Sequence, residues 1–198
     1  MWEERFAQEG YLFGTEPVLF LSKYAEFFEA GQTVLSIAEG EGRNGVQLAK
    51  MGLEVTGVEF APSANAKAEK LAKANDVAPT FLQADLFDWD WPAEKFDITL
   101  GLFFQFVGPE QRDILWRNML AATKPGGLVM IHGYTPEQVE LGTGGPPNVE
   151  NMYTPKDFTE IFGQCDVLVC EEYHAEQRSG SAHYGMSALI DFIARKPL

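Results

Sequence analysis

The sequence is poor in cysteine, histidine, basic residues and long apolar runs. Its 198 residues include two Cys and three His, which indicates neither a disulfide framework nor a metal site. Cys165 and Cys170 lie in or beside an apolar run, so we expect buried, reduced thiols. Lys and Arg total 15 against 29 Asp and Glu, a formal net charge of −14, which disfavours nucleic acid and anionic membranes as partners.

Long apolar segments are missing as well. No run reaches the roughly 18 apolar residues of a membrane span. The N-terminus lacks the basic start and apolar centre of a signal peptide. These absences predict a cytoplasmic protein with a small-molecule partner. They leave open whether it is a monomer or a homodimer.

What the chain does contain, after residue 31, is an alternation of strand-like and helix-like segments. Strands are expected at 33–38, 54–59, 79–83, 96–102 and 128–132, with helices at 43–51, 62–74, 109–122 and near 155–162. Two final strands, 166–174 and 184–195, have no helix between them, and residues 141–153 are too rich in Gly and Pro for regular structure. Helices at 2–9 and 17–29, with Pro17 in the first turn, precede this core.

This order of segments predicts one domain over residues 1–198, with N-terminal cap helices in 1–30 and the core in 31–198. The expected class is α/β, a three-layer sandwich. Its sheet would be Rossmann-like, mostly parallel and seven-stranded, with an antiparallel last strand.

A glycine turn follows the first strand and indicates a nucleotide site. Gly40-x-Gly42-x-x-Gly45 formally matches the dinucleotide fingerprint, and Glu59, able to bind ribose hydroxyls, ends the second strand. Pyrophosphate needs backbone N–H groups in a positive field, whereas Glu39 and Glu41 flank the first glycine. S-adenosylmethionine carries a sulfonium and an ammonium instead of phosphate, so the charges favour it. An NAD-dependent oxidoreductase and a non-catalytic S-adenosylmethionine-binding module remain alternatives.

Several motifs together resemble a known family. They are the run Ala38-Glu39-Gly40-Glu41-Gly42-Arg43-Asn44, the turn Lys124-Pro125-Gly126-Gly127, Tyr134-Thr135-Pro136, Ala194-Arg195-Lys196-Pro197, Trp2-Glu3-Glu4-Arg5-Phe6 and Gly14-Thr15-Glu16-Pro17. Over residues 31–197 the chain resembles the class I S-adenosylmethionine-dependent methyltransferases, and more narrowly the bacterial branch related to tellurite-resistance and thiopurine methyltransferases. The resemblance implies a transferase that uses S-adenosylmethionine and releases S-adenosylhomocysteine, without a metal.

The resemblance also implies cofactor-binding positions in the glycine turn. Ala38, Glu39, Gly40 and Gly42 match the family's glycine motif. Ser36 stands where the family usually has Asp, and Ala38 stands where it has the first Gly, a mild departure because the methyl group is small. The Glu39 carboxylate is expected either to meet the cofactor's amino group or to face solvent.

Further cofactor positions follow from the next strands. Glu59 would accept both ribose hydroxyl protons, and Phe60 would cover one adenine face. Asp85 would accept from the adenine amino group, and the Leu86 backbone N–H would face a ring nitrogen. Phe103 or Gln105, after the central strand, would face the methyl group.

The acceptor side is less defined in the sequence. Tyr11, His132, Tyr134 and His183 are candidate substrate-side groups, with His132 read as a core residue and Tyr134 as a residue of the site's rim. None of them can be assigned as catalytic. The loop 142–147 is expected to form a flexible wall of the acceptor pocket. Because an ionised soft acceptor needs no general base, we expect a thiol or chalcogen species.

Overall fold

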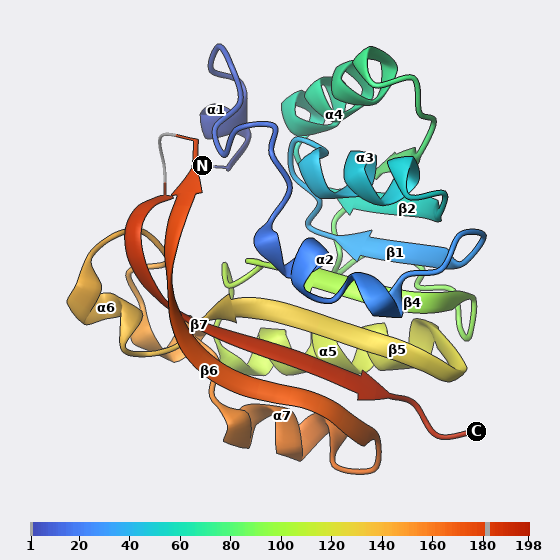
Figure 1. The fold of residues 1–198 in the computed structure, drawn as a ribbon, viewed down its shortest axis with the longest axis vertical. Helices are drawn as coiled ribbons and strands as arrows, with labels where there is room; N and C mark the ends of the chain where they lie inside the picture. Colours follow the sequence, from blue (N-terminus) through green and yellow to red (C-terminus); the bar gives the residue numbers. More distant parts are fainter. Residues whose placement is uncertain (1, 181–182) are drawn as a thin grey trace. The chain divides into compact units, whose positions relative to one another are not determined.

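The computed structural model describes residues 2–180 and 183–198. The chain divides into two compact units, Met1–Asp90 with Ser179–Ala182, and Trp91–Arg178 with His183–Leu198. The strand order is β3-β2-β1-β4-β5-β7-β6 in one seven-stranded sheet (Figure 1). Among the described residues no helix has the length and apolar character needed to cross a membrane.

In the first unit, parallel strands end beside the glycine turn. β1 (Thr33–Ile37), β2 (Glu54–Glu59) and β3 (Thr80–Gln83) pair in parallel, with Ser36 opposite Gly57. α3 (Arg43–Lys50) and α4 (Pro62–Ala74) connect these strands. α4 begins with Pro62, whose fixed φ suits a first turn, and it buries Ala64 and Ala68. The carboxyl ends of β1 and β2 therefore meet at the edge where the turn begins.

The N-terminal segment is less helical than the sequence predicts. α1 covers only Trp2–Phe6, and the expected helix 17–29 consists of α2 (Leu19–Lys23) and a 3-10 turn, η1 (Ala25–Phe27). Pro17 is not in the first turn, because the extended Val18 donates its N–H to Asn44 Oδ1 at 3.0 Å and the helix begins after it. Contact with the glycine turn thus overrides the local helical pattern.

In the second unit, β4 (Phe96–Leu102) pairs in parallel with β5 (Thr123–Tyr134), and β7 (His183–Arg195) pairs antiparallel with β5. α5 (Pro109–Ala122) connects β4 to β5, and β6 (Asp166–Ser179) is the outer neighbour of β7. β5 extends beyond the predicted 128–132, since Thr123 pairs with Phe96 across a register shift. The mostly parallel seven-stranded α/β fold with an antiparallel β7 is confirmed.

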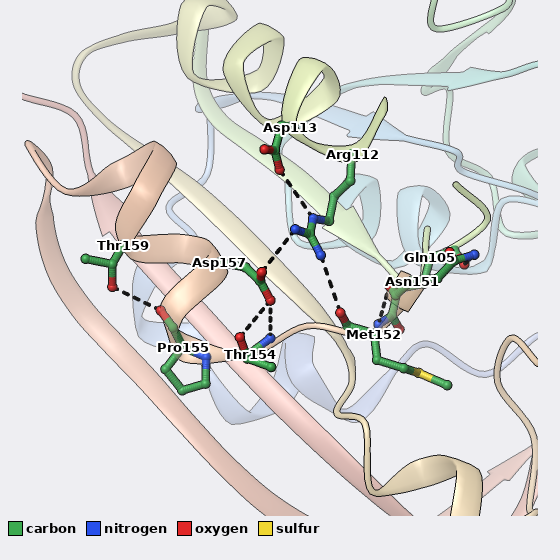
Figure 2. A network of polar contacts seen from close by, with 9 residues as sticks. All are labelled: Gln105, Arg112, Asp113, Asn151, Met152, Thr154, Pro155, Asp157 and Thr159. Carbon is green, nitrogen blue, oxygen red and sulfur yellow. Dashed lines mark hydrogen bonds and ion pairs between the residues drawn. The ribbon is translucent and has the colours of Figure 1, made fainter. Parts of the chain in front are cut away.

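The segment between β5 and β6 was wrongly predicted to lack regular structure throughout 141–153. α6 (Gln138–Leu141) reaches into it, η2 (Val149–Asn151) lies inside it, and α7 (Pro155–Phe162) follows. Figure 2 shows what holds this segment: the buried Arg112 guanidinium of α5 contacts the Met152 carbonyl at 3.4 Å and Asp157 at 3.1 Å. Asp157 in turn completes a capping box with Thr154. These contacts hold the part of the segment that follows η2 against α5.

The two thiols were wrongly expected to be buried. Cys170 is exposed on β6, and Cys165, just before this strand, is partly exposed. β6 has few buried side chains, so its apolar pattern did not indicate a core position.

Candidate functional site

The turn after β1 folds back tightly through left-handed backbone. Ala38, Gly40 and Gly42 have φ angles of 47°, 64° and 89°. A Cβ on Gly42 would lie 2.6 Å from the Cβ of Ala68, so only glycine allows α4 to approach so closely. Ala38 is a more costly departure from the family's glycine than its small methyl group suggested, because left-handed backbone is strained for an L residue.

The Glu39 side chain points into the protein. Its Oε1 accepts the Gly45 N–H at 2.6 Å, and its Oε2 accepts the Ser36 hydroxyl. The side chain is buried, so the expectation that it faces solvent is wrong. Burial raises the pKa of this carboxyl from 4.5 to about 7, although the bonds from Ser36 and Gly45 act in the opposite direction.

Glu59, at the end of β2, holds the same turn from the other side. Its Oε2 accepts the Gly40 N–H at 2.9 Å, and its Oε1 accepts the Ala61 N–H at 2.9 Å. The side chain is only 8% exposed, so the strand-end carboxylate is far less open than a free surface group. Desolvation raises its pKa despite the backbone bonds. The Phe60 N–H also bonds to this carboxylate, and the acceptor capacity that remains could serve a ligand hydroxyl.

The other residues predicted for the adenosine part lie after β2 and β3. Phe60, next to Glu59, is 58% exposed, which is unusual for a large aromatic side chain. Asp85 is exposed, and its Oδ1 accepts the Phe87 N–H at 3.0 Å in a local turn. Leu86 is buried. Within the first unit the structure thus brings Glu59 and the glycine turn together, and it leaves Phe60 and Asp85 accessible.

Three side chains of the turn hold the N-terminal segment. Glu41 accepts the Leu12 N–H at 2.7 Å and forms an ion pair with Lys67 at 2.8 Å. Arg43 donates to the Phe13 carbonyl at 2.9 Å, and Asn44 accepts from Val18. The acidic field inferred from the sequence is therefore partly neutralised, because Glu41 is paired and Glu39 is turned inward.

Within the predicted N-terminal cap, the rings of Trp2, Phe6 and Phe13 form an aromatic cap that packs on α4. Trp2 stacks on Phe6 at 5.7 Å between ring centroids, and Phe13 lies 6.4 Å from each ring. These rings cover Ala61 and Ala64. Tyr11, a candidate substrate-side group, donates its hydroxyl to the Lys67 carbonyl at 3.3 Å, so here it binds the protein.

In the second unit, Phe103 lies against two of the candidate substrate-side residues. Its ring centroid is 4.5 Å from that of His132 and 4.8 Å from that of Tyr134. Phe103 is half-buried and has a left-handed φ of 54°, with its N–H bonded to the His132 carbonyl at 2.9 Å. Tyr134 is 1% exposed, so its placement at a rim was wrong.

His132 is a buried residue, as expected, and its partner was missed in the sequence. Its Nδ1 lies 2.6 Å from Asp191 Oδ1, which also accepts the Tyr173 hydroxyl at 3.2 Å. Burial and the nearby Asp191 raise the pKa of Tyr173, which remains a protonated donor. Asp191 could have been suspected because it interrupts the apolar run Ala188–Ala194 of β7.

The side-chain amide of Gln105, the other residue that could face the methyl group, bonds to the protein: it exchanges two hydrogen bonds with the backbone of Tyr134, at 2.7 and 2.8 Å. The backbone carbonyl of Gln105 accepts from the Asn151 amide at 3.3 Å, as Figure 2 shows. The loop 142–147 is anchored through Thr143, which donates to the Met186 carbonyl at 2.6 Å. The side chain of His183 lies outside the described residues.

In the described part of the chain, no group of three or more His, Cys, Asp or Glu side chains is placed so that it could hold a metal ion.

Residues 34–127 match the family model described as the methyltransferase domain. A search of curated protein sequences finds no match. The matched range includes the glycine turn, Glu59, Asp85 and Phe103. It confirms the recognition of a methyltransferase that the sequence motifs suggested.

Solved structures agree in fold at low sequence identity. A SAM-dependent methyltransferase from Methanosarcina mazei has 16% identity and a TM-score of 0.72 over 89% of this chain and 97% of its own. TehB from Haemophilus influenzae has 18% identity and a TM-score of 0.72 over 89% of this chain, which spans only 61% of TehB. Magnesium protoporphyrin IX methyltransferase (ChlM) from Synechocystis PCC 6803, solved with bound S-adenosylhomocysteine, has 16% identity and a TM-score of 0.66 over 89% of this chain and 78% of its own.

The match over residues 34–127 and the fold shared with these structures both agree with the methyltransferase recognised from the sequence motifs. S-adenosylmethionine, the cofactor predicted from the sequence, agrees with these neighbours: the Methanosarcina mazei protein is SAM-dependent, and ChlM was solved with bound S-adenosylhomocysteine.

Proposed function

We propose that the chain transfers a methyl group from S-adenosylmethionine to a small-molecule acceptor, as one domain whose residues 1–30 form a cap. The observation that carries this proposal is the Glu59 carboxylate, which accepts the Gly40 N–H at the end of β2 and has acceptor capacity left for a ligand hydroxyl. The ribose hydroxyls would bind there. Each charge-assisted bond contributes about 1.5–3 kcal/mol.

The remaining cofactor contacts follow from the same edge of the first unit. Exposed Phe60 would cover one face of the adenine, whose flat apolar surface suits an aromatic ring. Asp85 would accept from the adenine amino group through its second oxygen, and the Leu86 N–H would meet a ring nitrogen. Ala38, Glu39, Gly40 and Gly42 would shape the turn near the methionine part, and Phe103 would lie near the methyl group.

The same geometry argues against the alternative of an NAD-dependent oxidoreductase. A pyrophosphate needs free N–H groups at the glycine turn and the first turn of the helix. Here the Gly40 N–H is bonded to Glu59 and the Gly45 N–H to Glu39, both carboxylates. Arg43, a cation of this turn, is bonded to the Phe13 carbonyl. A dianion would have to displace these bonds against negative charge.

For the acceptor we propose a thiol or chalcogen species. The formal charge of −14 disfavours nucleic acid. In the second unit Tyr134, Met152 and Leu189 form a buried cluster against which Phe103, Tyr173 and Ala175 pack, a soft and mostly apolar surface. The donor sulfonium is already activated, so holding the acceptor sulfur about 3–3.5 Å from the methyl carbon supplies most of what catalysis needs.

The test is transfer of labelled methyl from S-adenosylmethionine to separate panels of thiols, chalcogen oxyanions, phenols, amines and RNA. We expect labelled thiols or oxyanions and no labelled RNA, with Glu59→Ala as the inactive control. Efficient labelling of RNA alone would overturn the acceptor class. Cofactor binding without transfer to any panel would favour the non-catalytic binding module.

A further inference from the structure

The glycine turn contains an internal carboxylate whose role is separate from ligand contact. The Glu39 side chain folds back from the turn and fills space beside two glycines. A Cβ on Gly45 would lie 2.9 Å from Glu39 Oε1, and a Cβ on Gly57 would lie 3.0 Å from Glu39 Cγ. Gly45 and Gly57 are therefore places where a side chain would collide with Glu39. Gly45, the third glycine of the formal dinucleotide fingerprint, is therefore explained by the space that the Glu39 carboxylate needs.

The bonds of Glu39 join the two elements between which the turn runs. Oε2 accepts from the Ser36 hydroxyl of β1, and Oε1 accepts from the Gly45 N–H in the first turn of α3, at 2.6 Å. With the side chain only 6% exposed, both oxygens are used inside the protein. A carboxylate that links the end of β1 to the start of α3 fixes where Gly40 and Gly42 lie.

We propose that Glu39 is the positioning residue of the cofactor turn. Bonded to Ser36, its carboxylate orders the turn as an Asp side chain at position 36 would. The proposal rests on the proposed function for the identity of the ligand, S-adenosylmethionine. Under this proposal Glu39 does not contact the ligand's amino group, because its carboxylate is bonded to Ser36 and Gly45 and points away from the outer surface of the turn.

Charged groups on the neighbouring elements determine how this link responds to pH. Arg43 of α3 favours the ionised form of Glu39, whereas Glu59 of β2 disfavours it, and desolvation outweighs both. Phe81 of β3, packed against the same glycines, adds no charge. Ionisation above about pH 7 therefore favours withdrawal of Glu39 toward water, which would loosen the turn and weaken cofactor binding.

The first experiment measures hydrogen exchange of the Gly45 amide in the ligand-free protein, so it does not depend on the proposed function. Glu39→Ala should expose this amide and speed its exchange by about tenfold or more, whereas Glu39→Gln, whose amide oxygen can still accept, should keep it protected. The swap variant Ser36→Asp/Glu39→Ala should restore protection. Glu41→Ala, which removes the other acid of the turn, is the control and should leave it unchanged. Equal exchange in wild type and Glu39→Ala would overturn the proposal.

The second experiment measures S-adenosylhomocysteine affinity by calorimetry. We expect Glu39→Ala to weaken binding about tenfold or more, and Glu39→Gln and the swap variant to stay within about threefold of wild type. Wild-type affinity should fall several-fold from about pH 6 to about pH 9 relative to Glu39→Gln. If Glu39→Gln binds as weakly as Glu39→Ala, Glu39 contacts the ligand and the proposal is wrong. If wild type does not bind at all, the proposed function fails, and the exchange result still decides the role of Glu39.

Discussion

Glu39→Gln should change how the free energy of unfolding depends on pH. The pKa of Glu39 is about 7 in the folded protein against 4.5 for an unperturbed carboxyl, so between these values the folded state binds more protons than the unfolded state. The stabilising contribution of the protonated side chain is complete below the unfolded pKa and is lost as pH rises through the folded one. Wild type should therefore lose stability relative to Glu39→Gln as pH rises.

The size of this effect follows from the two pKa values. One pKa unit corresponds to about 1.36 kcal/mol, so the contribution of Glu39 should change by about 2 kcal/mol between about pH 5.5 and about pH 8. Glutamine is the appropriate replacement because its amide oxygen can accept from Gly45 while its amino group donates to Ser36. The variant therefore removes the ionisation and keeps the bonds.

Urea denaturation of wild type and Glu39→Gln at both pH values gives the measurement. The stability difference between the two proteins at one pH, subtracted from that at the other, cancels the titration of all the other carboxyls. Glu54→Gln, at an exposed position of β2, controls for the loss of one acidic side chain. A stability difference that is the same at both pH values would refute the reasoning, because Glu39 would then ionise alike in the folded and unfolded chain.

Three further predictions concern the turn, the cap and the second unit. Glu59→Ala should raise the dissociation constant for S-adenosylhomocysteine by about tenfold or more in calorimetry, and it should also lower the melting temperature, since the Gly40 and Ala61 N–H groups lose their acceptor; unchanged affinity in a folded variant would remove Glu59 from the site. Deleting residues 2–16 should reduce methyl transfer more than S-adenosylhomocysteine affinity, because the deletion removes the aromatic cap and spares Glu59; equal losses in the two assays would contradict a separate role for the cap. Asp191→Asn should lower the free energy of unfolding in urea by about 1–2 kcal/mol, because the bonds to His132 and Tyr173 lose their charge-assisted acceptor; full stability with lost turnover would show that the residue acts in catalysis instead.

The fold was predictable because its signals are local and repeated. Apolar strands such as Phe96–Leu102 and amphipathic helices such as Pro62–Ala74 are distinguished by their periods, and the final pair of strands gave the antiparallel β7. The errors lie where contacts between distant residues decide. Val18 ends up extended because Asn44 accepts its N–H, and the segment after α6 is ordered by Arg112, neither of which a local pattern contains.

The candidate site shows the same division. The spacing from the glycine turn to Glu59 located a strand-end carboxylate correctly, since both positions follow from consecutive strand–helix units. Side-chain direction was not predictable: Glu39 could turn toward ligand or solvent, and it turns inward because Gly45 and Gly57 leave room for it. The break in the apolar run of β7 marks Asp191 as unusual, but its pairing with His132 was not predictable, because the two residues lie 59 apart in sequence on different strands.

The most direct test of the central claim is calorimetric titration of the wild-type protein with S-adenosylhomocysteine and, separately, with NAD. The account predicts saturable binding of S-adenosylhomocysteine, and at a concentration one hundred times its dissociation constant a stabilisation of about 2.7 kcal/mol. NAD should give no heat of binding, because carboxylates already hold the Gly40 and Gly45 N–H groups that its pyrophosphate would need. Binding of NAD with no response to S-adenosylhomocysteine would contradict the account.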